Sequence, residues 1–557
     1  MRAVDDETQH PTHMERQPDW LEVAERSILL EAVSQWRDDP ENWFHGSFDR
    51  LPETVRINPL RKEVNWIEEW LKGVGARKID WFKGSGGAWR LPFQRGKASD
   101  KERNILKALH QTGRITRQEE VSMVPVLALD PKPGEIILDI CASPGSKTTQ
   151  ISENLANKGV VIANEVMSQR SNTLVSNVKR HASRNAIVVQ HDGRYIPKIP
   201  EEGFDRVLVD VPCSGSGTTR KNPELWEKWS PSAGHSLHDL QHALLSRAIQ
   251  VTKPGGRIVY STCSLDPIEN EAVVARSLLK GQVSIINGKD LLPDLPSSPG
   301  MSKWPMLDDL GKPSPNSDFP ETFSPPHDKR TASELKHCVR IWNDTIDGGG
   351  FFLCVLEKNP NQANSSSAEN KSNSIISSPA DPLSFPRPIQ EEWERKIRES
   401  WGNIPPSMWI RGKNLIWSTE ESLRIWRSQR FRRGSIYSGE CWRPLKVIHL
   451  GLIVARTKNG EIERILSRAL PSLCKSLDLP IHHVDSAFIN RILSGEKIFS
   501  EEIFGKTEDS PGSRLLSDRE GILLPVWVGS IITPMISESE AIFLRAMRDL
   551  SIASEEE

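Results

Sequence analysis

The 557-residue sequence predicts an α/β fold built on a mostly parallel, doubly wound sheet. Short apolar runs bounded by turn residues, such as Ile136–Ile140, have the length of buried strands. Helical patterns separate these runs, and strands that alternate with helices form parallel sheets. Two of the runs end at Asp210 and at Cys263. Because such sheets bind ligands beyond the carboxyl ends of their strands, these two ends predict a site.

The composition limits the class of protein. Contents of 37% hydrophobic and 26% charged residues are ordinary for a globular protein, and the length predicts two to four domains. With a net charge of −2, any nucleic-acid surface must be a local patch. The seven cysteines include no CxxC pair, which favours reduced cytosolic thiols over a zinc site. The sequence contains no apolar run of membrane-spanning length, so we expect no membrane partner.

The N-terminal part is predicted to combine helices with a short strand. Residues 1–18 are polar and are expected to be disordered. An amphipathic pattern predicts one helix over Trp20–Trp36 and another over Asn65–Val74, with a strand over Thr54–Ile57 between them. These elements suggest a small α+β subdomain before the main sheet.

Two helices of the main domain carry capping signals. Thr116 is expected to N-cap a helix that continues through an apolar run, with Glu119 completing a capping box. Asp266 is expected to cap a later helix, with Pro267 in its first turn. A longer helix is predicted over Pro231–Val251.

A strand, a tight loop and a helix follow one another at the first run, which is the arrangement of nucleotide-binding sheets. The loop begins after Asp139, and its helix should extend to about Asn154. A second strand ends at Glu165, where an acid commonly binds a ribose diol, and a third ends near Asp192, where an acid could accept a hydrogen bond from an adenine amine. The loop residues expected to hold this ligand are Cys141, Ala142, Ser143, Pro144, Gly145, Ser146 and Lys147.

The loop sequence restricts the ligand further. It is neither GxGxxG nor GxxxxGK followed by Ser or Thr, so dinucleotides and nucleoside triphosphates are disfavoured. Acids rather than arginines surround the expected site, which suits an adenosyl ligand without phosphates. S-adenosylmethionine is such a ligand.

The two strand-end cysteines suggest a particular chemistry. A pyrimidine carbon 5 becomes nucleophilic when a thiolate adds to carbon 6, a base must later remove the carbon-5 proton, and an acid must support the ring. Cys263, Cys213 and Asp210 supply a nucleophile, a second proton-transfer group and an acid. A buried cysteine is otherwise a small hydrophobic residue, and Cys338, Cys354, Cys441 and Cys474 are left in that class.

Taken together, these motifs resemble those of the Sun/Nop family of RNA cytosine-5 methyltransferases, and the resemblance is strongest to its tRNA-acting branch. The combination of DxPCSGxG with a downstream YSTCSxxPxENE is highly specific, and the resemblance covers roughly Leu51 to Lys358. The matching segments are Gly113–Pro125, Asp139–Thr149, Ala163–Glu165, Asp210–Asn222, Tyr260–Val274 and the segment ending in Gly349-Gly350-Phe351-Phe352.

This resemblance implies a role for each site residue. Cys263 would be the nucleophile, Cys213 would help to release the product, and Asp210 would contact the cytosine and the cofactor. Lys147 would lie near the methionine carboxylate of S-adenosylmethionine or near the target base. No metal is implied. The candidate RNA or active-site contacts are Arg56, Asn58, Arg170, Arg220, Lys221 and Asn222.

The resemblance also implies a domain plan, with a Rossmann-like S-adenosylmethionine-dependent core. A basic and aromatic stretch over Arg411–Arg443 suggests RNA binding by a C-terminal β-rich, PUA-like domain. The expected parts are a disordered tail (1–18), an N-terminal RNA-binding subdomain (19–112), the catalytic domain (113–358, with a surface insertion over 283–336), a linker (359–388) and the PUA-like domain (389–557).

Three departures from the family pattern and two alternatives stay open. Glu165 stands where relatives usually carry Asp, Ser216 replaces a frequent Asp, and Ile341-Trp342-Asn343 replaces a Leu-Pro-His-like segment. The favoured substrate is tRNA, acted on by a monomer in the cytoplasm, or in the nucleus of a eukaryote. The alternatives are ribosomal RNA as the substrate and an RNA-binding scaffold without catalysis.

Overall fold

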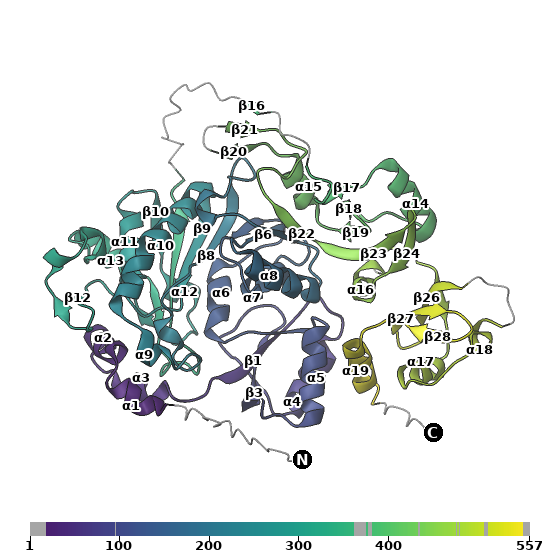
Figure 1. The fold of residues 1–557 in the computed structure, drawn as a ribbon, viewed down its shortest axis with the longest axis horizontal. Coiled ribbons are helices and arrows are strands. Elements are labelled where there is room, and N and C mark those ends of the chain that lie inside the picture. Colours follow the sequence, from purple (N-terminus) through teal and green to yellow (C-terminus); the bar gives the residue numbers. More distant parts are fainter. Residues whose placement is uncertain are drawn as a thin grey trace, which may run out of the picture.

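In the computed structural model, which describes residues 18–94, 96–360, 375–376, 381–432, 435–474, 476–477, 479–505 and 511–549, a ten-stranded sheet forms the centre of the chain (Figure 1). Its order is β11-β14-β15-β9-β8-β5-β6-β7-β22, with β10 paired to β15. The strands from β9 to β7 are parallel, which confirms the predicted doubly wound sheet. The strands are β5 (Ile136–Asp139), β6 (Val160–Asn164), β7 (Ala186–Val189), β8 (Phe204–Asp210), β9 (Thr252–Thr262), β10 (Val283–Ile286), β11 (Ser298–Pro299), β14 (Val339–Ile341), β15 (Phe351–Lys358) and β22 (Val447–Leu450).

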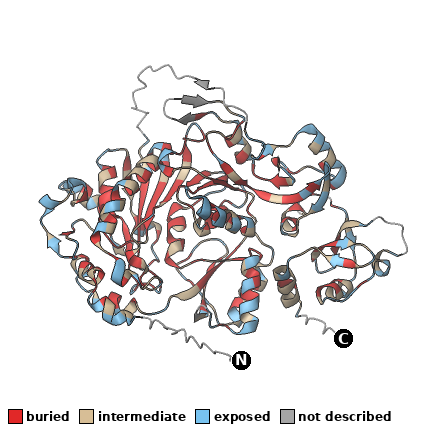
Figure 2. Cartoon of the chain, viewed as in Figure 1, coloured by how far each residue is buried: buried red, intermediate tan, exposed pale blue. Residues whose placement is uncertain are grey.

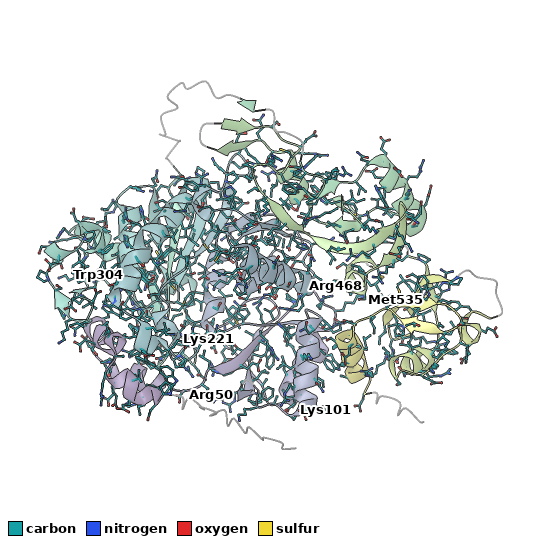
Figure 3. The ribbon with its side chains drawn as sticks, in the orientation of Figure 1. Arg50, Lys101, Lys221, Trp304, Arg468 and Met535 are labelled. Carbon is teal, nitrogen blue, oxygen red and sulfur yellow. The ribbon has the colours of Figure 1, made fainter. Side chains whose placement is uncertain are left out.

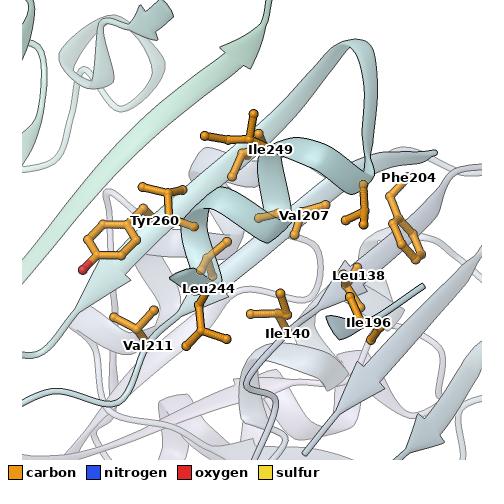
Figure 4. Close-up of a cluster of buried hydrophobic side chains, with 14 of the residues drawn as sticks. Leu138, Ile140, Ile196, Phe204, Val207, Val211, Leu244, Ile249 and Tyr260 are labelled. Atoms are coloured by element: carbon orange, nitrogen blue, oxygen red, sulfur yellow. The ribbon is translucent and has the colours of Figure 1, made fainter. Parts of the chain in front are cut away.

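Helices cover both faces of this sheet because its buried strands alternate between them. Leu138 and Leu244 belong to the hydrophobic cluster under α10 (Pro231–Val251) and α11 (Glu271–Leu278), part of which Figure 4 shows. Ile137 and Leu174 belong to the opposite cluster, under α6 (Val124–Leu129), α7 (Ser146–Asn154) and α8 (Ser168–His181). Burying each such side chain contributes roughly 1.5–3 kcal/mol. The buried residues concentrate in this central layer (Figure 2).

The N-terminal sheet extends past the boundary expected after residue 112. Its order is β2-β3-β1-β4, and β4 pairs with β1 from a position inside the expected catalytic domain. The elements of this N-terminal subdomain are β1 (Pro52–Ile57), α4 (Val64–Gly73), β2 (Arg77–Lys78), β3 (Ala88–Gln94), α5 (Asp100–Gln111) and β4 (Ile115–Arg117).

The predicted helix over 20–36 is two helices, because Ser27 accepts a hydrogen bond from the Leu30 amide and starts a new helix. Trp36 and Trp43 pack against tryptophans in and just after α9, with ring centroids 5.7 and 5.5 Å apart. These first helices therefore pack on the part of the chain that carries α9, not on the N-terminal sheet. They are α1 (Trp20–Glu25), α2 (Ile28–Trp36) and α3 (Glu41–Gly46), and α9 spans Leu225–Lys228.

The segment 283–336 is more than a surface insertion, since it adds β10 and β11 to the edge of the central sheet. Trp304 is buried there and donates its indole N–H to the Phe323 carbonyl at 2.9 Å. The remaining elements are α12 (Gly288–Leu291), β12 (Met306–Leu307), β13 (Pro313–Ser314), η4 (Asn316–Asp318), η5 (Glu321–Phe323) and α13 (Lys329–Leu335).

The expected cap at Asp266 is wrong. Its carboxylate accepts a hydrogen bond from the Ile268 amide within a turn, and α11 begins only at Glu271, after Asn270. The turn is possible because aspartate side chains bond readily to the backbone two residues on.

A strand and a helix of the C-terminal region pack directly against earlier parts of the chain. β22 extends the central sheet beside β7, and α19 packs against α5 (Figure 1). Two further sheets have the orders β17-β18-β19-β23-β24 and β25-β26-β27-β28, and β16, β20 and β21 form a third. The PUA-like assignment stays a prediction, and most of the expected linker, over 361–374 and 377–380, lies outside the described residues, as does the tail over 1–17.

The C-terminal region consists of short strands and short helices. The strands are β16 (Ile375–Ile376), β17 (Arg387–Pro388), β18 (Met408–Arg411), β19 (Asn414–Trp417), β20 (Arg430–Arg432), β21 (Ser435–Tyr437), β23 (Leu452–Lys458), β24 (Glu461–Ile465), β25 (Ile481–His483), β26 (Gly512–Ser517), β27 (Leu523–Val528) and β28 (Ile532–Pro534). The helices are α14 (Glu391–Trp401), α15 (Glu420–Arg427), η6 (Ser467–Ala469), α16 (Leu470–Leu473), α17 (Ser486–Leu493), α18 (Ser500–Phe504) and α19 (Glu538–Met547).

Candidate active site

Cys213 and Cys263 lie in contact at the carboxyl edge of the central sheet. Asp210 at the end of β8 pairs in register with Ser261 of β9, so the segments that follow these strands meet. The two Sγ atoms are 3.1 Å apart. Both side chains are partly exposed, whereas Cys338 is buried in the core. A nucleobase bound at this edge of the sheet can therefore contact both thiols.

Contact with Cys263 changes the acidity of Cys213. The hydrogen bond between the two thiols, together with burial, raises the pKa of Cys213 well above its ordinary value. Cys213 therefore keeps its proton at neutral pH while this contact exists.

Asp210 and Lys147 form an ion pair beside the thiols. Lys147 Nζ lies 2.8 Å from Asp210 Oδ2, and the Ser261 hydroxyl donates to Asp210 Oδ1 at 2.8 Å. Burial alone would lower the pKa of Lys147, but the charge of Asp210 and the hydrogen bond to it raise that pKa above its ordinary value. Lys147 therefore stays cationic at neutral pH.

The loop expected to hold the cofactor leads into α7 at the same edge. Gly145 is the N-cap of α7 with a φ of 109°, and a Cβ there would come within 2.8 Å of Leu174. Only glycine fits this backbone, and it leaves the start of the helix without a side-chain cap. Burial raises the pKa of Cys141 far above the ordinary range, so this thiol is not a nucleophile.

Glu165 and Asp192 are placed differently. Glu165 is 4% exposed, accepts a hydrogen bond from the Met167 amide at 2.9 Å, and lies beside exposed Val166. Asp192 already accepts the Arg194 guanidinium at 2.7 Å, and this hydrogen bond lowers its pKa. An adenine amine at Asp192 would have to share that carboxylate with Arg194.

Glu269 is a site residue that the sequence reasoning missed. One oxygen accepts the Ser214 amide at 2.8 Å and the Gln241 amide group at 2.9 Å, and the other accepts the Ser214 and Ser264 hydroxyls, both at 2.5 Å. Ser214 follows Cys213 and Ser264 follows Cys263, so a single carboxylate fixes both cysteine loops. The signal was in the sequence, because Glu269 lies in the PxENE part of the quoted motif.

Glu119 does not complete a capping box, because Thr116 lies in β4. The Glu119 carboxylate instead accepts a hydrogen bond from the backbone N–H of Gly349 at 3.0 Å. The two residues are 230 positions apart in the sequence. Burial raises the pKa of Glu119, against the opposing effect of the amides that it accepts. Nearby, Gly350 donates to the Gly217 carbonyl at 2.7 Å, and Gly217 donates to the Cys263 carbonyl at 2.9 Å. Glu119 therefore supports the backbone that packs behind Cys263.

Two of the six expected RNA contacts are buried, and the side chain of a third, Arg220, is only 4% exposed. Arg56 and Asn58 are 0% exposed and bond to groups inside the protein. Arg220 binds Asp347 and three backbone carbonyls. Lys221 is exposed, and Arg170 is half exposed, although it contacts the Ser143 carbonyl. Asn222 is partly buried and donates to Thr218.

The expected basic and aromatic surface over Arg411–Arg443 is only partly at the surface, because Lys413, Arg424 and Arg427 are exposed but two of its tryptophans lie in the core. Trp417 and Trp442 are buried, as is Arg430. These tryptophans cannot stack on bases while they pack inside the C-terminal region.

The described part of the chain shows neither a metal-binding cluster nor a membrane-spanning helix. Its residues include no group of three or more His, Cys, Asp or Glu placed to hold a metal ion. None of its helices combines the length and the apolar character that crossing a bilayer requires.

Comparison with known proteins places the chain among RNA methyltransferases. The family model for the 16S rRNA methyltransferase RsmB/F matches residues 126–290. A tRNA (cytosine(49)-C(5))-methyltransferase of Pyrococcus abyssi is 37% identical over 331 residues, which cover 59% of this chain and 95% of that protein. A multisite-specific tRNA:(cytosine-C(5))-methyltransferase of Saccharomyces cerevisiae is 40% identical over 296 residues, which cover 49% of this chain and 43% of that protein.

These matches have limits of length and likeness. The chain spans less than half of two of the curated relatives that it matches, at 43% and 44% of their length. A crystal structure of a methyltransferase homolog from Pyrococcus horikoshii is 27% identical, with a TM-score of 0.45 over 62% of this chain and 100% of that one.

Proposed function

The chain belongs to the RsmB/F (Sun/Nop) family of RNA cytosine-5 methyltransferases, and we propose that it methylates carbon 5 of cytosine in tRNA. The observation that carries this proposal is the 3.1 Å contact between Cys213 and Cys263, beside the Asp210–Lys147 ion pair. A scaffold without catalysis would have no need for two accessible thiols in contact with such a pair.

S-adenosylmethionine is the cofactor that these residues suit, and it supplies an electrophilic methyl group. The donor set fits an adenosyl ligand without phosphates: Glu165 can accept from a ribose diol, and the start of α7 can donate to a carboxylate. The loop cation, Lys147, is committed to Asp210. The residues proposed to hold the cofactor are Cys141–Lys147, Glu165, Asp192 and Asp210.

The chain's own groups supply the nucleophile, the base and the ring contact of the proposed reaction. The Cys263 thiolate adds to carbon 6 of cytosine, which makes carbon 5 nucleophilic, and Asp210 hydrogen-bonds to the ring while Lys147 balances its charge. Once carbon 5 carries the methyl group, its remaining proton must pass to a base. Cys213, 3.1 Å from the Cys263 sulfur, takes this proton in its thiolate form, because the adduct removes the hydrogen bond to Cys263 that raises its pKa. Loss of the proton re-forms the double bond between carbons 5 and 6, breaks the bond from carbon 6 to sulfur and returns the Cys263 thiolate.

The proposed substrate is tRNA rather than ribosomal RNA. The relative from Pyrococcus abyssi, 95% of which is covered, is named for tRNA. The ribosomal methyltransferase F of Aliivibrio salmonicida matches over 47% of its length at 37% identity. The proposed working form is a monomer whose partner is RNA, in the cytoplasm or in a eukaryotic nucleus.

The test is methyl transfer from labelled S-adenosylmethionine to tRNA and, separately, to ribosomal RNA. Bisulfite sequencing of both products then locates 5-methylcytosine. We expect label in tRNA at discrete cytosines. If only ribosomal RNA is labelled, the substrate is ribosomal RNA and not tRNA. If the chain binds S-adenosylmethionine but transfers no methyl group to any RNA, the alternative of a non-catalytic RNA-binding scaffold holds.

A further inference from the structure

A cavity of about 430 Å³ lies where the N-terminal subdomain, the end of α8 and the C-terminal region meet. We call it the junction cleft. Figure 3 marks Arg468 and Met535, which line it. Besides Arg114, six cationic lining residues come from all three parts of the chain: Arg61, Lys179, Arg180, Arg456, Arg464 and Arg468.

The junction cleft has almost no negative charge of its own. Among the described residues that line it, Glu540 is the sole carboxylate, and Arg114 occupies both of its oxygens at 2.8 Å. None of the six cations lies within 4 Å of a carboxylate in the described part of the chain. Their side-chain bonds go to neutral acceptors, such as Asn177 for Arg180 and Asn414 for Arg456.

Helix ends explain only part of this charge. Arg61 donates to the Thr112 carbonyl after α5, and Arg468 donates to the Lys179 carbonyl in α8, so both complement helix C-termini. Two such termini carry together about one negative elementary charge. Six cations therefore leave a large positive excess, and Lys179, Arg456, Arg464 and Arg468 are exposed to solvent.

Burial and neighbouring cations lower the pKa of several cleft residues, although Glu540 and Glu63 oppose this effect at Arg61. Burial and the nearby Arg114 lower the pKa of Arg61 to about 10. Burial, Arg411 and Arg468 lower the pKa of Lys179. Burial lowers the pKa of His449, which also lines the cleft, to about 3, so this ring is neutral near pH 7. The positive charge of the cleft is thus constant over the neutral pH range.

The junction cleft shares the lining residue Arg180 with a second cavity, of about 610 Å³. Pro144 and Gly145 of the loop that precedes α7 line this second cavity, as does Lys221. Arg180 therefore borders both the cleft and the side of the molecule that carries this loop. A small anion would need only two or three of these cations, whereas a chain of phosphates can use them all.

We propose that the junction cleft binds the phosphodiester backbone of the RNA substrate and leads it to the cysteines. This inference rests on the proposed function only in taking RNA as the substrate class. Phosphate contacts position an RNA without reading its sequence, so the cleft contributes affinity and register.

The test compares two full-length variants with the same change in charge. R456Q/R464Q removes two exposed cleft cations, and R395Q/R398Q removes two exposed cations of α14 that line neither cavity. Fluorescence anisotropy with a tRNA transcript at several salt concentrations gives affinity and salt slope, and calorimetry gives S-adenosylmethionine affinity. We expect R456Q/R464Q to weaken tRNA binding about tenfold and to lower the slope by about 1 to 2, because each lost phosphate contact removes about 0.7–0.9.

Three other outcomes would overturn the proposal, reassign the cleft or separate it from the proposed function. Wild-type affinity and slope in R456Q/R464Q, or an equal loss in R395Q/R398Q, would overturn the proposal. Inorganic phosphate that binds the wild type tightly, with tRNA affinity unchanged in R456Q/R464Q, would assign the cleft to a free anion instead. Loss of tRNA binding in a chain that methylates no RNA would uphold the cleft and contradict the proposed function.

Discussion

At the scale of single residues, Glu269 links the two loops that carry the cysteines. Its carboxylate accepts from Ser214 and Ser264, and its backbone carbonyl accepts the Tyr260 hydroxyl at 2.5 Å. A carboxylate with several donors orients its partners more firmly than an amide, which must offer two hydrogens. The thiol contact therefore depends on a residue that touches neither thiol.

We predict that Glu269→Gln lowers kcat for RNA methylation at least tenfold and leaves S-adenosylmethionine affinity unchanged. The substitution turns an acceptor of the Ser214 and Ser264 hydroxyls into a donor, so the cysteine loops lose their register. Steady-state kinetics and calorimetry measure the two effects. Exposed Glu227→Gln on α9 is the matched control, and full kcat in Glu269→Gln would refute the positioning role.

At the scale of elements, Arg56 fastens β1 to α7. Its Nε donates to Glu153 Oε2 at 2.7 Å, and His181 at the end of α8 contacts the other oxygen at 2.9 Å. All three side chains are buried. The arginine expected to touch RNA instead holds the N-terminal sheet to the helix that begins at the cofactor loop.

Replacing Arg56 with Met should lower the free energy of unfolding by about 3–5 kcal/mol, because it leaves a buried carboxylate without its cation. Urea denaturation followed by tryptophan fluorescence measures the loss. Arg56→Met/Glu153→Met, which removes both charges, should recover much of it. An equal loss in the single and double variants would show that packing, not charge, holds this junction.

The same cluster gives an acid-side pH dependence. Despite burial, Arg56 and His181 hold the pKa of Glu153 below its ordinary value of 4.5. The stability from this group is therefore present above about pH 4.5 and is lost as the pH falls through the lower native pKa. We expect Glu153→Gln to unfold with a weaker pH dependence below 4.5 than the wild type in thermal melts, and unchanged dependence would contradict the assignment.

Local sequence patterns predicted individual strands and helices better than the contacts between them. The run ending at Asp210, the helix over Pro231–Val251 and the cysteine strand ends were predictable, because local periodicity and turn residues define them. The partners of Glu119 and Arg56 were not, since they lie 230 and 97 positions away. The sequence around Thr116 has a helix-capping pattern, but Thr116 pairs with Arg56 in the N-terminal sheet instead of starting a helix.

At the scale of the whole molecule, the C-terminal region shares a hydrophobic cluster with the N-terminal subdomain. Phe543 of α19 is fully buried among residues of that cluster, against Trp66 at 5.3 Å and under Arg114 at 3.8 Å. The expected order of separate domains along the chain does not describe this arrangement. The junction cleft exists because these two ends of the chain meet.

We therefore predict that Phe543→Ala loosens the N-terminal subdomain. The cavity it leaves should lower the free energy of unfolding by about 3–5 kcal/mol. Hydrogen exchange should show faster exchange in α5 as well as in α19. Faster exchange confined to α19 would mean that the two parts are held together less tightly than the shared cluster implies.

The central claim is that Cys263 attacks the cytosine and Cys213 releases it. Denaturing gel electrophoresis of the full chain, mixed with tRNA and S-adenosylmethionine, tests it most directly. We expect Cys213→Ala to accumulate a covalent protein–RNA adduct, because release is blocked after the attack, and Cys263→Ala to form none. An adduct in Cys263→Ala, or none in either variant while the wild type methylates the same RNA, would contradict the account.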